Sequence, residues 1–244
     1  MPFAADPWDL LLIAAVSLQV TAVAYLRAPR WKALILCLPF PFTIVALGLG
    51  RPIDVTNLLG LIAIFLYVHA IRLLYRRLGL PIIPAISLAL AGYCLLGWAV
   101  VDLLPATPMS FWTTAVAVCL LAFFLHRRLP PRSEPGHRTP LPVWLKLPVV
   151  VAVVCLLLLV KESLQGFATL FPLVSVVGAY EARHSLWTLG RQMPVLMLTL
   201  TPLMAVAHLT QKHVGLGPSL LFGWAAFLLI LLPLTRAMWR RKAA

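Results

Sequence analysis

Four ionisable residues in the second half of the chain are the ones whose type and position could do chemistry. Lys161 and Glu162 stand between two apolar runs, and Glu181 and Arg183 follow directly after the second run. A charged group at membrane depth costs a few kcal/mol, so it is a functional hypothesis by default. We interpret Lys161 as a group that meets an anionic substrate, and Glu162 or Glu181 as the carboxylate that takes and releases a proton. In the alternative, Lys161 reaches out to water and Glu181 forms a surface ion pair with Arg183.

A second set of ionisable candidates lies outside this stretch. Asp54 and Arg51 follow an apolar segment of the first half, and we interpret Asp54 as a further proton-coupling carboxylate with Arg51 as its ion-pair partner. His208, like His69, lies toward the C-terminal end of an apolar segment. An imidazole titrates near neutral pH, so His208 is a candidate for proton relay. The alternative for both histidines is a hydrogen bond to a helix carbonyl.

The patterns that mark enzymes and cofactor proteins are missing from the sequence. There is no HExxH, no CxxC pair, no P-loop and no GxGxxG. Ser185 stands beside His184, but adjacent residues on a helix point in different directions and cannot act as a nucleophile and its base. The four cysteines lie inside apolar segments and are interpreted as small buried hydrophobes. We therefore predict neither an enzyme nor a bound metal or cofactor.

The composition places the chain in a membrane. Hydrophobic residues make up 62% and charged residues 11% of the sequence, against about 45–50% and about 25% in soluble domains. The formal net charge of +13 would suggest nucleic acid in a soluble protein. Most of the basic residues flank apolar runs, where the positive-inside rule accounts for them. The predicted partners are thus membrane lipids and a small-molecule or lipid-like substrate, and not nucleic acid.

Nine apolar segments predict an all-α polytopic membrane protein with about nine transmembrane helices. The segments are 10–26, 33–50, 55–75, 82–101, 110–125, 147–160, 167–180, 193–209 and 219–234. Two of them, 147–160 and 167–180, have the length of re-entrant segments rather than of full spans. We nevertheless predict full crossings, because a re-entrant pair would reverse the later spans and worsen the charge distribution in the loops.

The loop charges predict the orientation. With the N-terminus outside, 17 of the 20 Lys and Arg residues fall on the inner side, as the positive-inside rule requires. The prediction is a bacterial inner (cytoplasmic) membrane protein with an external N-terminus and a cytoplasmic C-terminus. The long loop 126–146, rich in Pro and Arg, is interpreted as an irregular, solvated cytoplasmic connection. A contact with anionic lipid is the alternative for this loop.

A weak internal repeat divides the chain. Sliding the sequence by 131 residues superposes Phe40-Pro41 on Phe171-Pro172, Val45 on Val176 and Leu58 on Leu189. We predict a first four-helix repeat over 1–104, a linking helix and basic loop over 105–146, and a second, inverted four-helix repeat over 147–244. Proline-interrupted segments at corresponding positions of two halves point to a substrate site near the bilayer midplane. Phe40, Pro41, Phe171 and Pro172 are therefore predicted to bind substrate, although prolines also kink helices for packing alone.

The motif run LLLLVKESLQGFATLFPLVSVVGAYEARHSLWTLGRQM in the second half resembles the GlpM-like small four-span bacterial membrane proteins. The matching positions are Lys161, Phe171, Pro172, Tyr180, Glu181 and Arg183. The resemblance implies a fused pair of units that elsewhere occur singly, and an association with cell-surface polysaccharide production. It adds Lys161 and Tyr180 to the predicted substrate-binding residues, and it supplies no biochemical activity.

The sequence as a whole predicts a secondary transporter that moves a small or amphipathic solute by alternating access, with proton coupling. Inverted repeats with interrupted helices are common in such proteins. Two alternatives stay open: a non-transporting scaffold for cell-surface polysaccharide or lipid-linked precursor pathways, and a passive ion channel. A homodimer or a partner protein from envelope biosynthesis is also an expected partner.

Overall fold

The computed structural model describes residues 7–101, 107–130, 132, 134–137, 142–161 and 169–240, and only the backbone of 101, 157–161 and 238. Within these residues the chain is helical, with a short 3₁₀ turn at 169–170 and no strand. The helices are α1 (Pro7–Tyr25), α2 (Pro29–Leu36), α3 (Phe40–Leu49), α4 (Val55–Arg76), α5 (Ile82–Val101), α6 (Pro108–Arg128), α7 (Val143–Lys161), α8 (Leu173–Glu181), α9 (Leu186–Val214) and α10 (Leu216–Arg240). The all-α class predicted from the sequence is thus confirmed.

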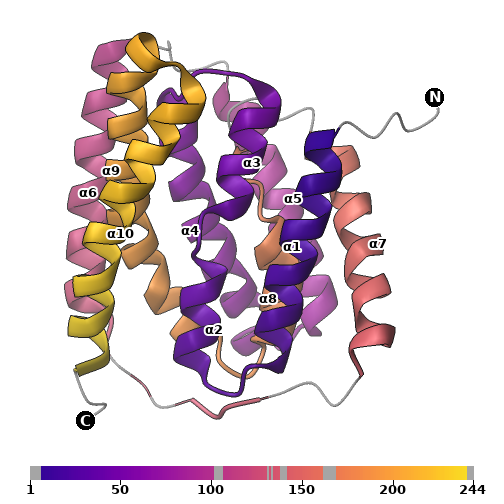
Figure 1. The fold of residues 1–244 in the computed structure, drawn as a ribbon. Coiled ribbons are helices and arrows are strands. Elements are labelled where there is room, and N and C mark those ends of the chain that lie inside the picture. The colour runs from indigo at the N-terminus through magenta and orange to yellow at the C-terminus, as the bar shows by residue number, and fades with distance from the viewer. Residues whose placement is uncertain are drawn as a thin grey trace.

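The helices form one bundle whose elements run alternately up and down (Figure 1). The turns 26–28, 77–81 and 182–185, the linker between α6 and α7 and the end of α10 gather at one end of the bundle, the lower end in Figure 1. This end carries most of the Lys and Arg residues and is called the basic end below. The two chain termini lie at opposite ends of the bundle.

Seven helical stretches are long and apolar enough to cross a membrane. They are Pro7–Tyr25, Pro29–Leu49, Val55–Arg76, Ile82–Val100, Pro108–Arg128, Leu186–Val214 and Leu216–Ala237. Each corresponds to one of the nine predicted segments. The other two are the short predicted segments. Helix α7 has 19 residues, and its apolar stretch is Val143–Leu156 among the residues whose side chains are described, whereas α8 has only 9 residues. At 1.5 Å per residue, α8 spans about 13.5 Å, less than half of the roughly 30 Å of hydrocarbon.

The second span is broken into α2 and α3 because Pro39 has no backbone N–H to donate to the preceding turn. The Ile35 carbonyl, which loses this donor, accepts from the Leu38 N–H at 3.1 Å. Gln19 of α1 adds a side-chain donor at the break, since its Nε2 lies 2.5 and 3.3 Å from the carbonyl oxygens of Ile35 and Leu38. Pro39 precedes α3 with φ −84° and ψ 33°. Pro172 precedes α8 with nearly the same values, φ −75° and ψ 43°.

Two long helices, α4 and α9, pack on each other at the centre of the bundle, and α6 packs against both. Helix α5 pairs with α4 and also contacts α8, while α10 pairs with α9 and also contacts α3. Helix α1 packs between α7 and the short helices α2, α3 and α8. The outer faces of the bundle carry exposed large apolar side chains, such as Leu95, Trp98, Leu120 and Leu229. This outward apolar surface is what a lipid environment requires.

Candidate functional site: a cavity between two helix starts

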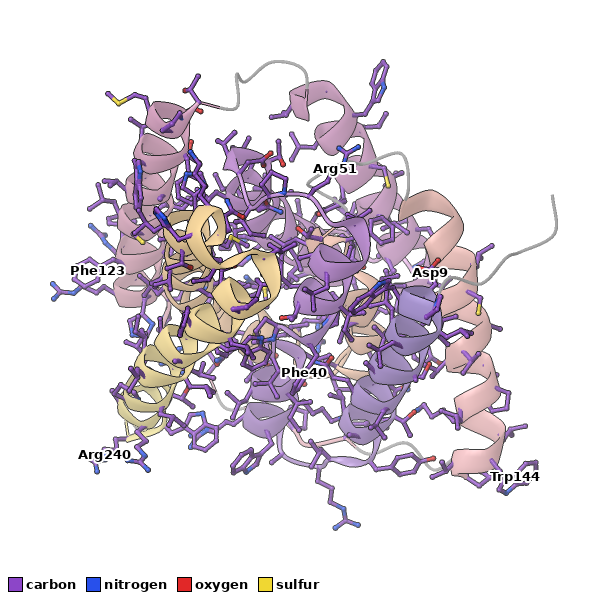
Figure 2. The ribbon with its side chains drawn as sticks, turned by 45° about the horizontal axis from the view of Figure 1, so that its top comes forward. Asp9, Phe40, Arg51, Phe123, Trp144 and Arg240 are labelled. Atoms are coloured by element: carbon purple, nitrogen blue, oxygen red, sulfur yellow. The ribbon has the colours of Figure 1, made fainter. Side chains whose placement is uncertain are left out.

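A small cavity lies between the two proline-marked helix starts. It is lined by Leu36, Cys37, Leu38, Pro39, Pro41 and Phe42 from the α2–α3 break, by Thr169, Leu170, Phe171, Pro172, Val174 and Ser175 around the start of α8, and by Ile64, Leu196 and Leu200. Figure 2 shows Phe40, at the start of α3, between Arg51 near one end of the bundle and Arg240 at the other. The structure thus brings together the two proline-interrupted segments that the sequence analysis paired.

The cavity is small and mostly apolar. Its volume is about 50 Å³, which holds a few water molecules and is far below the roughly 300–1,000 Å³ of ligand sites. The polar side chains in its wall are Thr169 and Ser175, and the Thr169 hydroxyl accepts a hydrogen bond from Asn57 Nδ2 at 2.9 Å. The first-turn N–H groups of α8 also lie here without an intrahelical acceptor. The cavity is partly open and not fully enclosed.

Two aromatic residues that the sequence analysis missed cover the helix starts. Tyr93 of α5 packs edge-on against Phe171, with ring centroids 5.9 Å apart. Trp224 of α10 packs on Phe40 at 5.1 Å, and its indole N–H donates to the hydroxyl of Thr43 at 2.8 Å. Each helix start is therefore covered by an aromatic ring from the other half of the chain.

A signal for these two residues was present in the sequence. The displacement of 131 residues that aligns Phe40 with Phe171 also aligns Leu90-Ala91-Gly92-Tyr93 with Leu221-Phe222-Gly223-Trp224. Both runs read as leucine, any residue, glycine, aromatic.

The expected residue Phe40 falls outside the cavity wall. Its side chain is 48% exposed, because it faces Trp224 on the outer side of α3.

Glu181 lies in a buried ion pair at the basic end, about 9 Å along α8 from Ser175 in the cavity wall. Its Oε1 is 2.6 Å from Nζ of Lys146, and the two side chains are 2% and 7% exposed. Lys32 Nζ donates to the backbone carbonyl of Glu181 at 3.2 Å. The predicted partner, Arg183, is not the one found. Lys146 takes that place because α7 packs on α8, a contact that sequence spacing does not reveal.

Arg183 and Tyr180 pack on each other at the basic end. The guanidinium of Arg183 lies 4.6 Å from the centre of the Tyr180 ring, and its Nη1 donates to the Tyr180 carbonyl at 3.0 Å. Tyr180 is 40% exposed and does not line the cavity. It stands five residues, about 1.4 helical turns, beyond Ser175 in the cavity wall, and its role in substrate binding stays a prediction.

Asp54 and Arg51 do not pair with each other in the structure. Asp54 is the N-cap of α4: its carboxylate accepts from the backbone N–H and hydroxyl of Thr56 at 2.9 and 2.6 Å, and Asn57 completes a capping box. Arg51 is exposed, and the ion pair expected between the two residues is not among the contacts of the described part of the chain. The local capping geometry explains Asp54 without a proton-coupling role.

His208 bonds a backbone carbonyl, although that carbonyl belongs to the loop before α4 and not to a helix as the alternative had it. Its Nδ1 donates to the carbonyl of Ile53 at 2.7 Å, and its ring stacks on Phe111 with centroids 3.9 Å apart. Gln211, on the next turn, accepts from the N–H of Ile53 at 2.8 Å and donates to its carbonyl at 3.1 Å. His208 and Gln211 therefore fasten the loop before α4 to α9. His69 donates to a helix carbonyl, that of Phe65, at 2.9 Å.

Two predicted residues cannot be placed in the site. Lys161 is the last residue of α7 and its side chain is not described, and Glu162 lies outside the described residues. Their predicted roles in anion binding and proton coupling stay predictions.

The linker that was expected to be solvated instead folds onto the start of α9. Glu134 accepts from the backbone N–H groups of Trp187 and Thr188 at 3.1 and 2.6 Å, and from the Thr188 hydroxyl at 2.7 Å. The Trp187 ring lies between the guanidinium groups of Arg72 and Arg132, at 4.1 and 4.2 Å. Glu134, which the sequence analysis did not consider, supplies the N-cap contacts that Ser185 does not make.

Two histidines meet beside this docked linker. The rings of His137 in the linker and His184 in the turn before α9 lie 4.6 Å apart. Partial burial and the nearby charge of Arg183 lower the pKa of both imidazoles below the ordinary value of 6.5. Both rings are therefore neutral at pH 7.

No protein-family model, curated protein or solved structure matches the chain. The resemblance to the GlpM-like proteins stays a prediction.

Proposed function

We propose that the protein is a secondary transporter whose substrate site is the cavity between the α2–α3 break and the start of α8. The observation that carries the proposal is that both proline-marked helix starts line one cavity. Interrupted helices that meet inside a bundle form the substrate sites of many transporters. A non-helical backbone at membrane depth is tolerated where it is buried in protein or lines such a cavity.

The helix contacts support two inverted units, α1–α5 and α7–α10, with α6 between them. Helix α5 of the first unit contacts α8 of the second, and α10 of the second contacts α3 of the first. The same exchange occurs in the side chains, with Tyr93 on Phe171 and Trp224 on Phe40. Helix α6 packs against both α4 and α9, as expected of a linking helix between two related halves.

The positive-inside rule supports a cytoplasmic location for the basic end. In this orientation we assign α8 to a ninth crossing of a bacterial inner membrane, and the N-terminus is external. The buried pair of Glu181 and Lys146 then closes the cytoplasmic side of the cavity. A proton on Glu181 neutralises its carboxylate and leaves Lys146 buried without a counter-charge, which favours separation of α8 from α7.

Cysteine labelling tests the alternating access that this proposal requires. Cys37 lines the cavity and is 2% exposed. In a variant that keeps Cys37 and replaces Cys94, Cys119 and Cys155 by alanine, we expect slow labelling by a membrane-impermeant thiol reagent from either side. Added substrate should change the labelling rate from the two sides in opposite directions. Equal rates with every solute of a broad panel would contradict alternating access.

Flux measurements separate the transporter from the two other hypotheses. In proteoliposomes with an imposed pH gradient, a transporter gives saturable solute uptake, and Glu181→Gln should abolish its dependence on the gradient. A scaffold gives no flux at all, and a channel gives a conductance far above transporter turnover that does not depend on Glu181. Normal coupled uptake in Glu181→Gln would remove this carboxylate from the mechanism.

A further inference from the structure

Lys32 is a buried cation without a carboxylate partner in the described part of the chain. Its side chain is 2% exposed and is among the largest fully buried ones. An ammonium group has three donors, and the contact found for this one is the neutral carbonyl of Glu181 at 3.2 Å. The Glu181 carboxylate is engaged by Lys146. A buried cation is costly unless it is paired, so this location favours an added anion.

Gln192 of α9 is a second buried donor whose hydrogen bond is not made. It is 1% exposed, and its Nε2 has no acceptor among the described residues. A buried amide donor without an acceptor destabilises the folded protein. Neither Gln192 nor Lys32 is explained by the helix caps and ion pairs described above.

The two donors lie at the same depth, next to the cavity. Lys32 is four residues before Leu36, and Gln192 is four residues before Leu196; both leucines line the cavity. Residues four apart on a helix share a face, and four residues rise about 6 Å. Helices α2 and α9 pack on each other and both run away from the basic end. Lys32 and Gln192 therefore stand one turn below the cavity on its basic side.

The cavity wall nearest to Lys32 along α2 is formed by Leu36. Leu36 packs so closely on Gly178 of α8 that a Cβ built on this glycine would lie 2.6 Å from Leu36 Cδ2. Gly178 stands on α8 between Ser175, which lines the cavity, and Glu181, which belongs to the charged cluster. A rotation of the Leu36 side chain would join the apolar cavity to the two donors.

We propose that Lys32 and Gln192 bind the anionic group of the substrate, a carboxylate or a phosphate, while the apolar cavity takes the remainder of the molecule. The proposal rests on the proposed function, because it assumes that this cavity is the substrate site. An ammonium and an amide N–H are suited to an oxyanion, and charge-assisted hydrogen bonds are the stronger kind. The substrate class is thus an amphipathic anion. Its anionic group meets Lys32 near the basic end, whereas the sequence analysis assigned anion recognition to Lys161.

The test is anion binding by the full chain in phosphatidylcholine nanodiscs. The probes are sodium phosphate and sodium benzoate, at constant ionic strength, and the readout is the midpoint of thermal unfolding followed by tryptophan fluorescence. A separate arm replaces part of the lipid with phosphatidylglycerol, without added anion. A saturable rise with a soluble probe identifies a soluble anion. A rise in the phosphatidylglycerol arm alone identifies a lipid headgroup.

The variants separate anion binding from simple capping of α8. We expect Lys32→Gln, which keeps a donor for the Glu181 carbonyl but removes the charge, to weaken the apparent affinity roughly tenfold or more. Lys32→Arg should keep binding, and Lys212→Gln, an exposed lysine at the opposite end, is the matched control. Gln192→Leu should weaken binding while leaving the charges unchanged, which keeps the test open if Lys32→Gln does not fold.

Two results would overturn the anion site: no saturable rise with any of the three anion sources, or the same affinity in Lys32→Gln and the parent protein. The outcome also separates this inference from the proposed function. Anion binding without flux in proteoliposomes would keep the site and remove the transporter. Uptake that is the same in Lys32→Gln would keep the transporter and remove the anion site.

Discussion

The two short helices that start at the cavity end in different ways. Helix α3 ends at Gly50 in the left-handed conformation, φ 60°, and hydrogen bonds with the side chains of Gln211 and His208 hold the loop after it. Helix α8 ends at Glu181 in a buried ion pair. The displacement of 131 residues that aligns the helix starts also aligns Gly50 with Glu181. The two halves therefore share a backbone design and differ in electrostatics, with the buried charge confined to the basic end.

The helices that follow are also capped differently. Helix α4 is capped by its own preceding residue, Asp54. Helix α9 follows Ser185, whose side chain makes no cap contact, and Glu134 from the linker bonds the first N–H groups of the helix instead. The cap of α4 thus comes from a residue next to it in sequence, whereas the cap of α9 depends on the linker.

The largest expected effect comes from breaking the ion pair at the end of α8. Lys146→Met leaves the Glu181 carboxylate buried without its partner, so we expect a loss of about 3–5 kcal/mol in the free energy of unfolding. Adding Glu181→Leu should restore most of the loss, because the pair is then replaced by apolar groups. Denaturant titration in mixed micelles measures both variants. A loss below about 1 kcal/mol for the single variant would show that the pair is solvated.

An intermediate effect is expected from the linker cap. Glu134→Ala removes three hydrogen bonds to a charged group at the start of α9, so we expect a loss of about 1.5–3 kcal/mol and faster proteolysis within the linker. Glu134→Asp, which keeps the charge on a shorter side chain, is the matched control. If both variants unfold like the parent protein, the linker does not stabilise α9.

Smaller effects are expected at the opposite end, which sharpens the comparison. Gly50→Ala forces a side chain into the left-handed region, at a cost of about 1–2 kcal/mol, and Asp54→Ala removes a helix cap at about 1 kcal/mol. Neither change should alter the pH dependence of stability, because no buried ion pair is disturbed. An Asp54→Ala loss as large as that of Lys146→Met would contradict the proposed difference between the two ends.

The smallest effect is a pH dependence that arises from His137 and His184. Their pKa values are lowered in the folded protein by partial burial and by the charge of Arg183, with Arg76, Lys32 and Lys146 adding to the positive charge and Glu181 opposing it at His137. A lowered folded pKa means that the unfolded chain binds protons first, so stability is complete above pH 6.5 and declines as the pH falls below it.

Thermal midpoints at pH 7.5 and pH 5.5 measure this decline. We expect the midpoint to fall at the lower pH, and the fall to be smaller in His137→Gln/His184→Gln. A midpoint that rises at pH 5.5 in the parent protein, and not in the double variant, would show that the sign is wrong.

The sequence predicted the helices better than the long-range side-chain contacts between them. Composition and segment length gave the all-helical membrane class and seven of the spans, because apolar length is a local property. The two proline breaks were also predicted to meet, and they line one cavity. The partners of Glu181 and of the α9 N-terminus were not predicted. Lys146 and Glu134 are 35 and 53 residues from the groups they bind, and only the packing of the helices decides such contacts.

The contact made by Gln19 also decides which parts of the bundle can separate. Its amide donates to the carbonyl groups of Ile35 and Leu38 at the break, and the Ile35 carbonyl also accepts from the Leu38 N–H. Pulling α1 away from the broken span would therefore leave the buried amide N–H groups of Gln19 without these acceptors. Helix α1 is therefore held to the break between α2 and α3, and we expect α1, α2 and α3 to move as one rigid unit. A motion that exposes the cavity would therefore separate α1–α3 from α8 and α9. Among the described residues, α8 and α9 make no comparable hydrogen bond to the α2–α3 break.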